Sequence, residues 1–278
     1  MSEDKILEII NKSGNTFHYK VVDFLRDSGW QVLVSPYYND GFTEKPREVD
    51  IIAEKTFEIK HGISGWLGVI NVRLFIECKF ITNDTVFWFD KRDRERAIER
   101  VIFDTSLDHP ERSTLTNNHH YLNGSEVAKL FCSEKGGSSE TEVMFKAVTQ
   151  SLNSMIYYKN KPTITISEWA DKHRPEITLD YPIISCNSFE KFWGINMVKK
   201  DGPNKILENF QLEVQYAYLD PGRNSKNEYY LIDVVDFNLL GKFITSLEGS
   251  DIRIVRDKII WDKATRPAPR IIPNVSDR

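Results

Sequence analysis

The spacing of apolar and polar positions along the chain predicts an alternation of helices and strands. Residues 17–28 place apolar side chains at i, i+4, i+7 and i+8, as an amphipathic helix does, and Gly29 follows where glycine commonly ends a helix. Residues 141–158 have a similar helical spacing. Residues 211–218 alternate polar and apolar side chains and residues 229–235 are mostly apolar, which indicates a half-exposed strand and a buried one. These elements predict an α/β protein with a mixed β-sheet flanked by helices.

Two further predicted strands carry charged residues among their apolar ones. The first contains Glu48 and Asp50, and the second contains Glu77 and Lys79. Successive side chains of a strand point to opposite faces, so the two charges of each strand share a face, and the other face, which includes Phe80, should lie in the core. Burying such charges is costly unless they pair or bind a metal. We therefore expect these charged side chains to have a function in the protein. The two strands are predicted over residues 48–53 and 72–80.

These charged residues suit hydrolysis of a phosphodiester bond. Asp50 and Glu77 offer the oxygen ligands that Mg²⁺ prefers, and the backbone carbonyl of Cys78 could add another ligand. Lys79 would lie beside the metal, where it could orient or help deprotonate the attacking water and offset charge in the transition state. A salt bridge among the three side chains that merely crosses two strands fits the same spacing.

The order of motifs between residues 14 and 90 resembles the PD-(D/E)xK nuclease superfamily, and is most similar to its restriction-endonuclease-like, Mrr-type bacterial members. The resemblance rests on the helix and Gly29, followed by Tyr37-Tyr38-Asn39-Asp40, Arg47-Glu48-Val49-Asp50, Glu77-Cys78-Lys79 and the Trp-containing run 85–89. It implies a restriction-endonuclease-like core with additional C-terminal strands and helices. It also implies a divalent-metal-dependent endonuclease that cleaves DNA, with a role in defence against foreign DNA, and Asp50, Glu77 and Lys79 as its active-site residues.

One residue departs from the family pattern. Members commonly place a glutamate on the first helix, facing the metal, and His18 stands at the matching position. Imidazole suits Mn²⁺ better than Mg²⁺, so His18 could be a ligand in a site that accepts Mg²⁺ or Mn²⁺, a donor to phosphate, or a sign of lost catalysis. Glu48 and Gln150 are candidates for supporting roles behind the metal ligands.

Candidate contacts to nucleic acid follow the predicted active site. Arg92, Arg94 and Arg96 belong to a basic run that is predicted to be helical, and some of them could reach a phosphate backbone. A solvated helix face with internal salt bridges explains the same run. Tyr37 and Tyr38 could line the substrate groove, although packing in the core explains them equally well.

The composition and charge of the chain are those of an ordinary globular protein and do not by themselves indicate a function. A net charge of −4 argues weakly against a protein that coats DNA, and the three scattered cysteines indicate reduced thiols. The sequence shows no apolar run long enough to span a membrane and no apolar leader, so we expect a cytoplasmic protein. We predict one α/β domain over residues 1–263, with the nuclease-like core at about 12–160, an extension of the sheet and helices at 161–263, and an irregular Pro-rich tail at 264–278.

Other functions fit the same sequence. The chain could be a catalytically inactive nuclease-fold module used in binding or assembly, or a nuclease that acts on RNA or branched DNA. Cleavage of both strands of a duplex would favour a homodimer. The adjacent pair His119-His120 is expected to be exposed at the tip of a loop.

Overall fold

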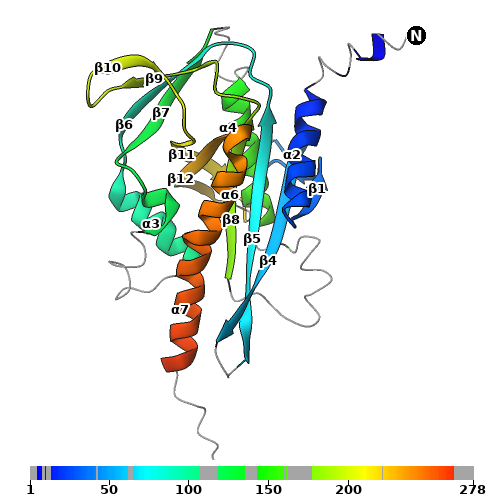
Figure 1. Cartoon of the computed structure of the whole chain (residues 1–278), viewed down its shortest axis with the longest axis vertical. Helices are drawn as coiled ribbons and strands as arrows, with labels where there is room; N and C mark the ends of the chain where they lie inside the picture. The colour runs from blue at the N-terminus through cyan, green and yellow to red at the C-terminus, as the bar shows by residue number, and fades with distance from the viewer. Residues whose placement is uncertain are drawn as a thin grey trace, which may run out of the picture.

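The computed structural model describes residues 5–7, 10, 14–41, 43–61, 65–106, 118–134, 143–159, 161, 177–220 and 222–265. Within these residues, ten strands form one mixed sheet flanked by helices, which confirms the predicted α/β class (Figure 1). The elements are α2 (Asn15–Asp27), β1 (Gln31–Val34), β2 (Tyr37–Asn39), β3 (Pro46–Glu48), β4 (Ile51–His61), β5 (Gly65–Lys79), β6 (Thr85–Lys91), α3 (Arg94–Thr105), the 3₁₀ helix η4 (His120–Leu122), β7 (Glu126–Ser133), α4 (Val143–Tyr158), β8 (Ile177–Cys186), β9 (Phe192–Asn196), β10 (Asp201–Lys205), β11 (Phe210–Leu219), β12 (Ser225–Asp236), the 3₁₀ helix η6 (Phe237–Leu239), α6 (Leu240–Gly249) and α7 (Asp251–Thr265). None of the helices in the described ranges combines the length and apolarity that crossing a bilayer requires.

The strand order of the large sheet is β1-β4-β5-β8-β12-β11-β7-β6-β9-β10. Strands β1, β4 and β5 form an antiparallel meander, and β8 then pairs in parallel with both β5 and β12. The structure differs here from the expected C-terminal extension of the sheet. Strands β8, β12 and β11 come late in the sequence but lie in the middle of the sheet, between β5 and β7.

The two faces of the sheet are covered by different helices. Leu74 and Ile76 of β5 pack in a core with buried residues of α2, α3, α6 and α7, whereas Phe75 packs in a second core with buried residues of α4. Because side chains alternate along a strand, Glu77 and Lys79 follow Phe75 onto the face covered by α4.

The helix predicted to end near Gly29 is confirmed. Helix α2 buries Phe17, Val21, Val22 and Leu25, the face expected from their spacing. Gly29 has a φ of 79°, the left-handed conformation in which glycine follows the end of a helix.

The predicted strand 48–53 is interrupted in the structure. Glu48 is the last residue of β3, which pairs with β2 in a separate two-stranded sheet. Strand β4 of the large sheet starts at Ile51. The reason lies in the intervening residue: the N–H of Asp50 donates to the side chain of Glu77 instead of to a neighbouring strand. The second predicted strand is longer than expected, since β5 begins at Gly65, and it ends before Phe80, which is exposed and outside the core.

The chain end also differs slightly from the prediction. Helix α7 continues to Thr265, so the predicted start of the tail at 264 falls inside a helix. Residues 266–278, the remainder of the predicted tail, lie outside the described residues.

Candidate functional site

The register of β4 and β5 brings Asp50, Glu77 and Lys79 together. Ile51 pairs with Ile76, so Asp50, one residue before, and Glu77, one residue after, are neighbours where the pairing of β4 and β5 ends. Lys79 Nζ lies 2.6 Å from Glu77 Oε2 and 4.0 Å from Asp50 Oδ2. The predicted proximity of these three side chains is therefore confirmed.

Asp50 is fixed by both its backbone and its side chain. Its N–H donates to Glu77 Oε1 at 3.3 Å, and its Oδ2 accepts from the N–H of Cys78 at 2.7 Å. Its carbonyl oxygen accepts from the N–H of Ser35 at 2.8 Å and from His18 Nε2 at 2.9 Å. These four bonds hold the carboxylate in place while leaving Oδ1 without a hydrogen-bond partner in the described part of the chain.

Glu77 is the most buried member of the site. Its side chain is fully buried, and burial, followed by the nearby charge of Asp50, raises its pKa to about 8 against the opposing effect of Lys79. Burial alone would lower the pKa of Lys79, but the carboxylates of Glu77 and Asp50 outweigh it and hold that pKa above its usual value. The site thus combines an ammonium with the carboxylate of Asp50 and a fully buried Glu77 carboxyl group that holds its proton more tightly than usual.

His18 reaches the site through the backbone of Asp50. A carbonyl oxygen can only accept a hydrogen bond, so Nε2 of His18 carries the proton and donates it. In this arrangement Nε2 has no lone pair for a metal, and only Nδ1 could act as a ligand. His18 therefore helps to position Asp50, and a direct metal role for it remains a prediction.

Of the other residues predicted around the site, some contact the segment that carries Asp50, and one is packed in the core. Gln150 on α4 donates from Nε2 to the carbonyl oxygen of Glu48 at 3.2 Å, so these two residues do meet beside Asp50. Tyr37 is 64% exposed and pairs across the hairpin with Glu48. Tyr38 is 2% exposed and packs in the core with residues of α4. Of the two roles considered for it, packing in the core is therefore the one that its position fits.

The oxygen atoms at this site fit a hard divalent cation. Within a strand, the N–H and C=O of one residue point to the same side, and Cys78 N–H points to Asp50, so its carbonyl also faces Asp50. The carbonyl of Lys79 points the other way and accepts from Asn187 N–H at 3.2 Å. Asp50, Glu77 and the Cys78 carbonyl thus offer oxygen atoms of the kind that Mg²⁺ or Mn²⁺ binds, and these atoms lie on neighbouring residues where the pairing of β4 and β5 ends.

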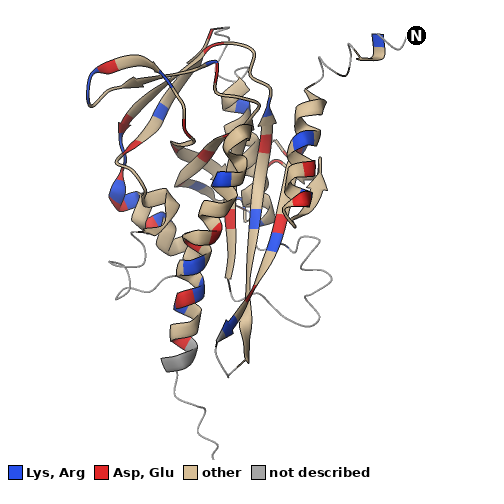
Figure 2. Cartoon of the chain, viewed as in Figure 1, with Lys and Arg blue, Asp and Glu red and all other residues tan. Residues whose placement is uncertain are grey.

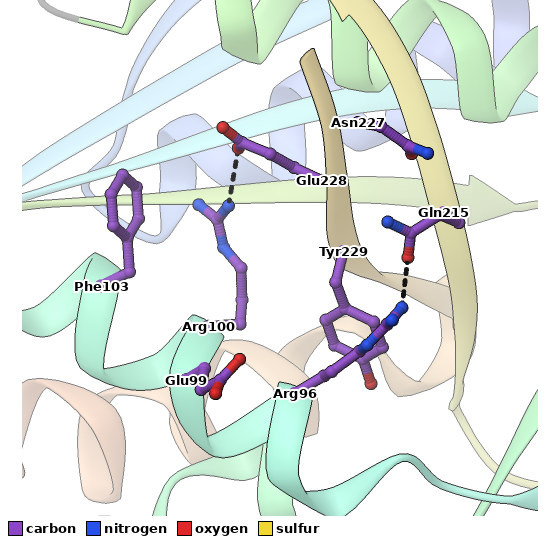
Figure 3. Close-up of a pocket in the computed structure, with 8 residues that line it drawn as sticks. All are labelled: Arg96, Glu99, Arg100, Phe103, Gln215, Asn227, Glu228 and Tyr229. Carbon is purple, nitrogen blue, oxygen red and sulfur yellow. Dashed lines mark hydrogen bonds and ion pairs between the residues drawn. The ribbon is translucent and has the colours of Figure 1, made fainter.

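The arginines predicted to contact nucleic acid lie on the other side of the sheet. Helix α3, which carries Arg94 and Arg96, packs on the face opposite to α4, and Arg92 lies two residues before its first residue. Arg96 donates to Gln215 at 2.8 Å across a cavity of about 390 Å³ between α3 and β11–β12 (Figure 3). The structure does not bring these arginines to Asp50 and Glu77.

A second cluster of buried titratable residues was missed from the sequence. His119 and His120 are buried, contrary to the expected loop tip, and their rings stack with centroids 5.1 Å apart. His120 Nε2 lies 3.0 Å from Asp233 Oδ2, and its Nδ1 bonds to Asp251 Oδ2, which also accepts from Tyr181 at 3.0 Å. Asp233 stands inside the apolar run 229–235, which is a weak sign of a special role, whereas nothing around Asp251 in the sequence points to it.

The protonation pattern of this cluster is that of an ion-pair network. His119 Nδ1 accepts from the N–H of Tyr121 at 3.2 Å, so the proton of a neutral ring is on Nε2, 3.2 Å from Asp251 Oδ2. Burial lowers the pKa of His119 to about 4 and keeps that ring neutral, whereas the two carboxylates outweigh burial and raise the pKa of His120 to about 10. Although the ligand atoms of His119, His120 and Asp251 lie close enough to share an ion, the nitrogen of His119 that faces Asp251 carries a proton. The geometry therefore favours hydrogen bonds over metal coordination.

Comparison of the chain with protein-family models, with curated proteins and with solved structures finds no match. The assignment of a function consequently depends on the geometry of the candidate site.

Proposed function

We propose that this protein is a divalent-metal-dependent nuclease with a restriction-endonuclease-like core that hydrolyses phosphodiester bonds, with DNA as its substrate and defence against foreign DNA as its role. The observation that carries the proposal is the convergence of Asp50, Glu77 and Lys79 where the pairing of β4 and β5 ends. A fully buried glutamate beside a lysine and a second carboxylate is costly to maintain, which supports a chemical use for the group.

Each residue has a distinct task in the proposed reaction. Asp50, Glu77 and the Cys78 carbonyl would hold Mg²⁺ or Mn²⁺, which when bound supplies a Lewis acid for the phosphate and lowers the pKa of a water molecule. Lys79 is held by Glu77, so its ammonium can orient the attacking water and stabilise charge that develops on the phosphate. His18 and Gln150 brace the segment 48–50 through its carbonyl oxygens, which fixes the direction of the Asp50 carboxylate.

The first test is cleavage of supercoiled plasmid, linear duplex, single-stranded DNA and RNA by the purified chain, with Mg²⁺, Mn²⁺ or a chelator. We expect metal-dependent cleavage that falls by about 100-fold or more in Lys79→Ala and in Asp50→Asn, because each loses a group that acts in the transition state. Lys55→Ala is the matched control, since Lys55 forms a comparable ion pair with Glu248 at 3.0 Å elsewhere on β4.

The outcomes separate the candidate functions. Cleavage that persists in both site variants would place the active site elsewhere in the protein. If no substrate is cleaved and calorimetry detects no uptake of Mg²⁺ or Mn²⁺, a nuclease-fold module for binding or assembly becomes the better description. The preferred substrate in the panel distinguishes a DNA nuclease from an RNA nuclease.

A further inference from the structure

A buried arginine stands at the start of α3, far along the sheet from the candidate active site. Arg92 is 9% exposed. Its backbone N–H donates to the carbonyl of Ser125 at 2.9 Å, and its Nη2 donates to the carbonyl of Asn123 at 2.9 Å. These contacts fix the side chain against the turn that precedes β7.

The remaining donors of this guanidinium are unsatisfied. Nε and Nη1 of Arg92 are buried and have no hydrogen-bond partner among the described residues. Burial lowers the pKa of Arg92, but an arginine remains charged in a protein. A buried donor without a partner costs about 1–3 kcal/mol, so an acceptor that is not part of the described chain is expected beside Arg92.

The carboxylates that act on Arg92 electrostatically are bonded to other partners. Glu213 and Asp233 influence the charge of Arg92 electrostatically. The oxygens of Glu213 bind Lys129 at 3.1 Å, Tyr229 at 2.9 Å and the N–H of Asp93 at 3.1 Å. Those of Asp233 are bonded to His120 at 3.0 Å and Gln211 at 3.3 Å. Among the residues that the structure describes, Arg92 therefore has electrostatic compensation from these carboxylates but no direct ion pair.

Arg92 lines a cavity of about 480 Å³ together with two more cationic residues, Lys91 and Arg94. Basic residues are visible where α3 begins (Figure 2). The carboxylate in the lining, that of Glu126, is already bonded to Asn196 at 2.7 Å and to Lys199 at 3.3 Å. The cavity thus has an excess of positive charge.

We propose that this cavity binds the phosphate group of a small organic phosphate. The positive charge of Lys91, Arg92 and Arg94 around the cavity suits a phosphate, whose oxygens arginine side chains bind in a forked geometry. Leu122 and Val198 add apolar surface to the lining, suited to the organic part of such a ligand, and the cavity volume is in the range of small-molecule sites. Strands β8, β12 and β11 separate β5 from β7 in the sheet, so this site is distinct from Asp50 and Glu77.

The test is calorimetric titration of the full chain with inorganic phosphate, a nucleoside 5′-monophosphate and a short DNA oligonucleotide, each compared with chloride at equal ionic strength. We expect saturable binding of the monophosphate, with inorganic phosphate weaker because it lacks the organic part. Binding should be at least tenfold weaker in Lys91→Gln, whose side chain is exposed and whose loss does not threaten folding, and abolished in Arg92→Gln.

Two controls make the result specific. Arg253→Gln removes an exposed arginine on α7 and should leave binding unchanged, and Lys79→Ala should also leave it unchanged because the two sites are separate. The proposal is overturned if the wild type shows no binding beyond chloride, which would leave only buried water as the partner of Arg92. It is also overturned if Arg253→Gln weakens binding as much as Lys91→Gln, if the oligonucleotide alone binds, or if Lys79→Ala abolishes binding.

Discussion

At the scale of single residues, several carboxylates with little or no exposure to solvent have a cation beside them. Glu77 has Lys79 at 2.6 Å, and Asp180 receives two bonds from the fork of Arg73 at 2.6 and 2.7 Å. His120 lies between Asp233 and Asp251. In such pairs the loss of one partner is costly, since the remaining charge stays buried without compensation.

His120→Phe is therefore expected to destabilise the protein by about 3–5 kcal/mol, because it leaves Asp233 and Asp251 buried without their shared cation. Urea denaturation followed by circular dichroism measures the change. Adding Asp233→Asn to this variant removes one of the two uncompensated charges and should recover part of the loss. A change smaller than about 1 kcal/mol would mean that His120 is neutral in the folded protein.

The same residue makes stability depend on pH. The folded pKa of His120, about 10, is above its unfolded value, so its contribution is complete below about pH 6.5 and is lost as pH rises through 10. Urea denaturation of wild type between pH 7 and 10 should therefore show a steeper fall in the free energy of unfolding than the same series with His120→Phe. Parallel curves for the two proteins would contradict the charged imidazolium.

Single residues also show what the sequence could predict. Asp50, Glu77 and Lys79 were predicted to meet because their strands are close in sequence and alternation fixes the faces. The burial of His119 and His120 could not be predicted, because the partner that holds them, Asp251, follows 131 positions after His120. A charged pair with such a separation leaves no local pattern.

At the scale of elements, the end of α2 depends on one glycine. Gly29 has a φ of 79°, while an added Cβ would meet nothing within 4 Å, so backbone conformation alone opposes substitution there. Gly29→Ala should cost about 1 kcal/mol in thermal or urea unfolding. Gly249→Ala is the matched control, since its Cβ also meets open space but its φ is not positive, and it should be neutral or slightly stabilising. Equal effects of the two substitutions would contradict this explanation.

Periodicity predicted α2 and α4 well, since a helix is specified by its own spacing of apolar residues. It failed at the junction of β3 and β4. Asp50 looks like the middle of a strand, yet its N–H bonds to the side chain of Glu77 and its carbonyl to His18. Side-chain bonds that interrupt a strand come from distant residues, so alternation alone could not locate the break.

At the scale of the whole molecule, the candidate active site and the basic start of α3 face different sides of the sheet. Arg47 is exposed on β3, three residues before Asp50, whereas Arg96 lies on α3. Arg47→Gln should weaken binding of a DNA oligonucleotide several-fold, and Arg96→Gln should change it less than about twofold, as measured by fluorescence anisotropy. The reverse order would mean that nucleic acid approaches the face covered by α3.

The α/β class was predictable for the whole molecule, but the strand order was not. Local patterns identify the strands, yet the pairing of β5 with β8 joins segments separated by α3, β6, β7 and α4. Such pairing depends on the packing of complete elements, and several orders satisfy the same apolar pattern.

The central position of the late strands also determines when the site can form during synthesis. Asp50, Glu77 and Lys79 leave the ribosome early. Strand β5 can pair with β8 only after β8 has emerged, and β8 can pair with β12 only after β12 has followed. A nascent chain that stops before β12 has the residues of the site without the sheet that holds them. If the protein cuts nucleic acid, it becomes competent to do so only once most of the chain has been translated.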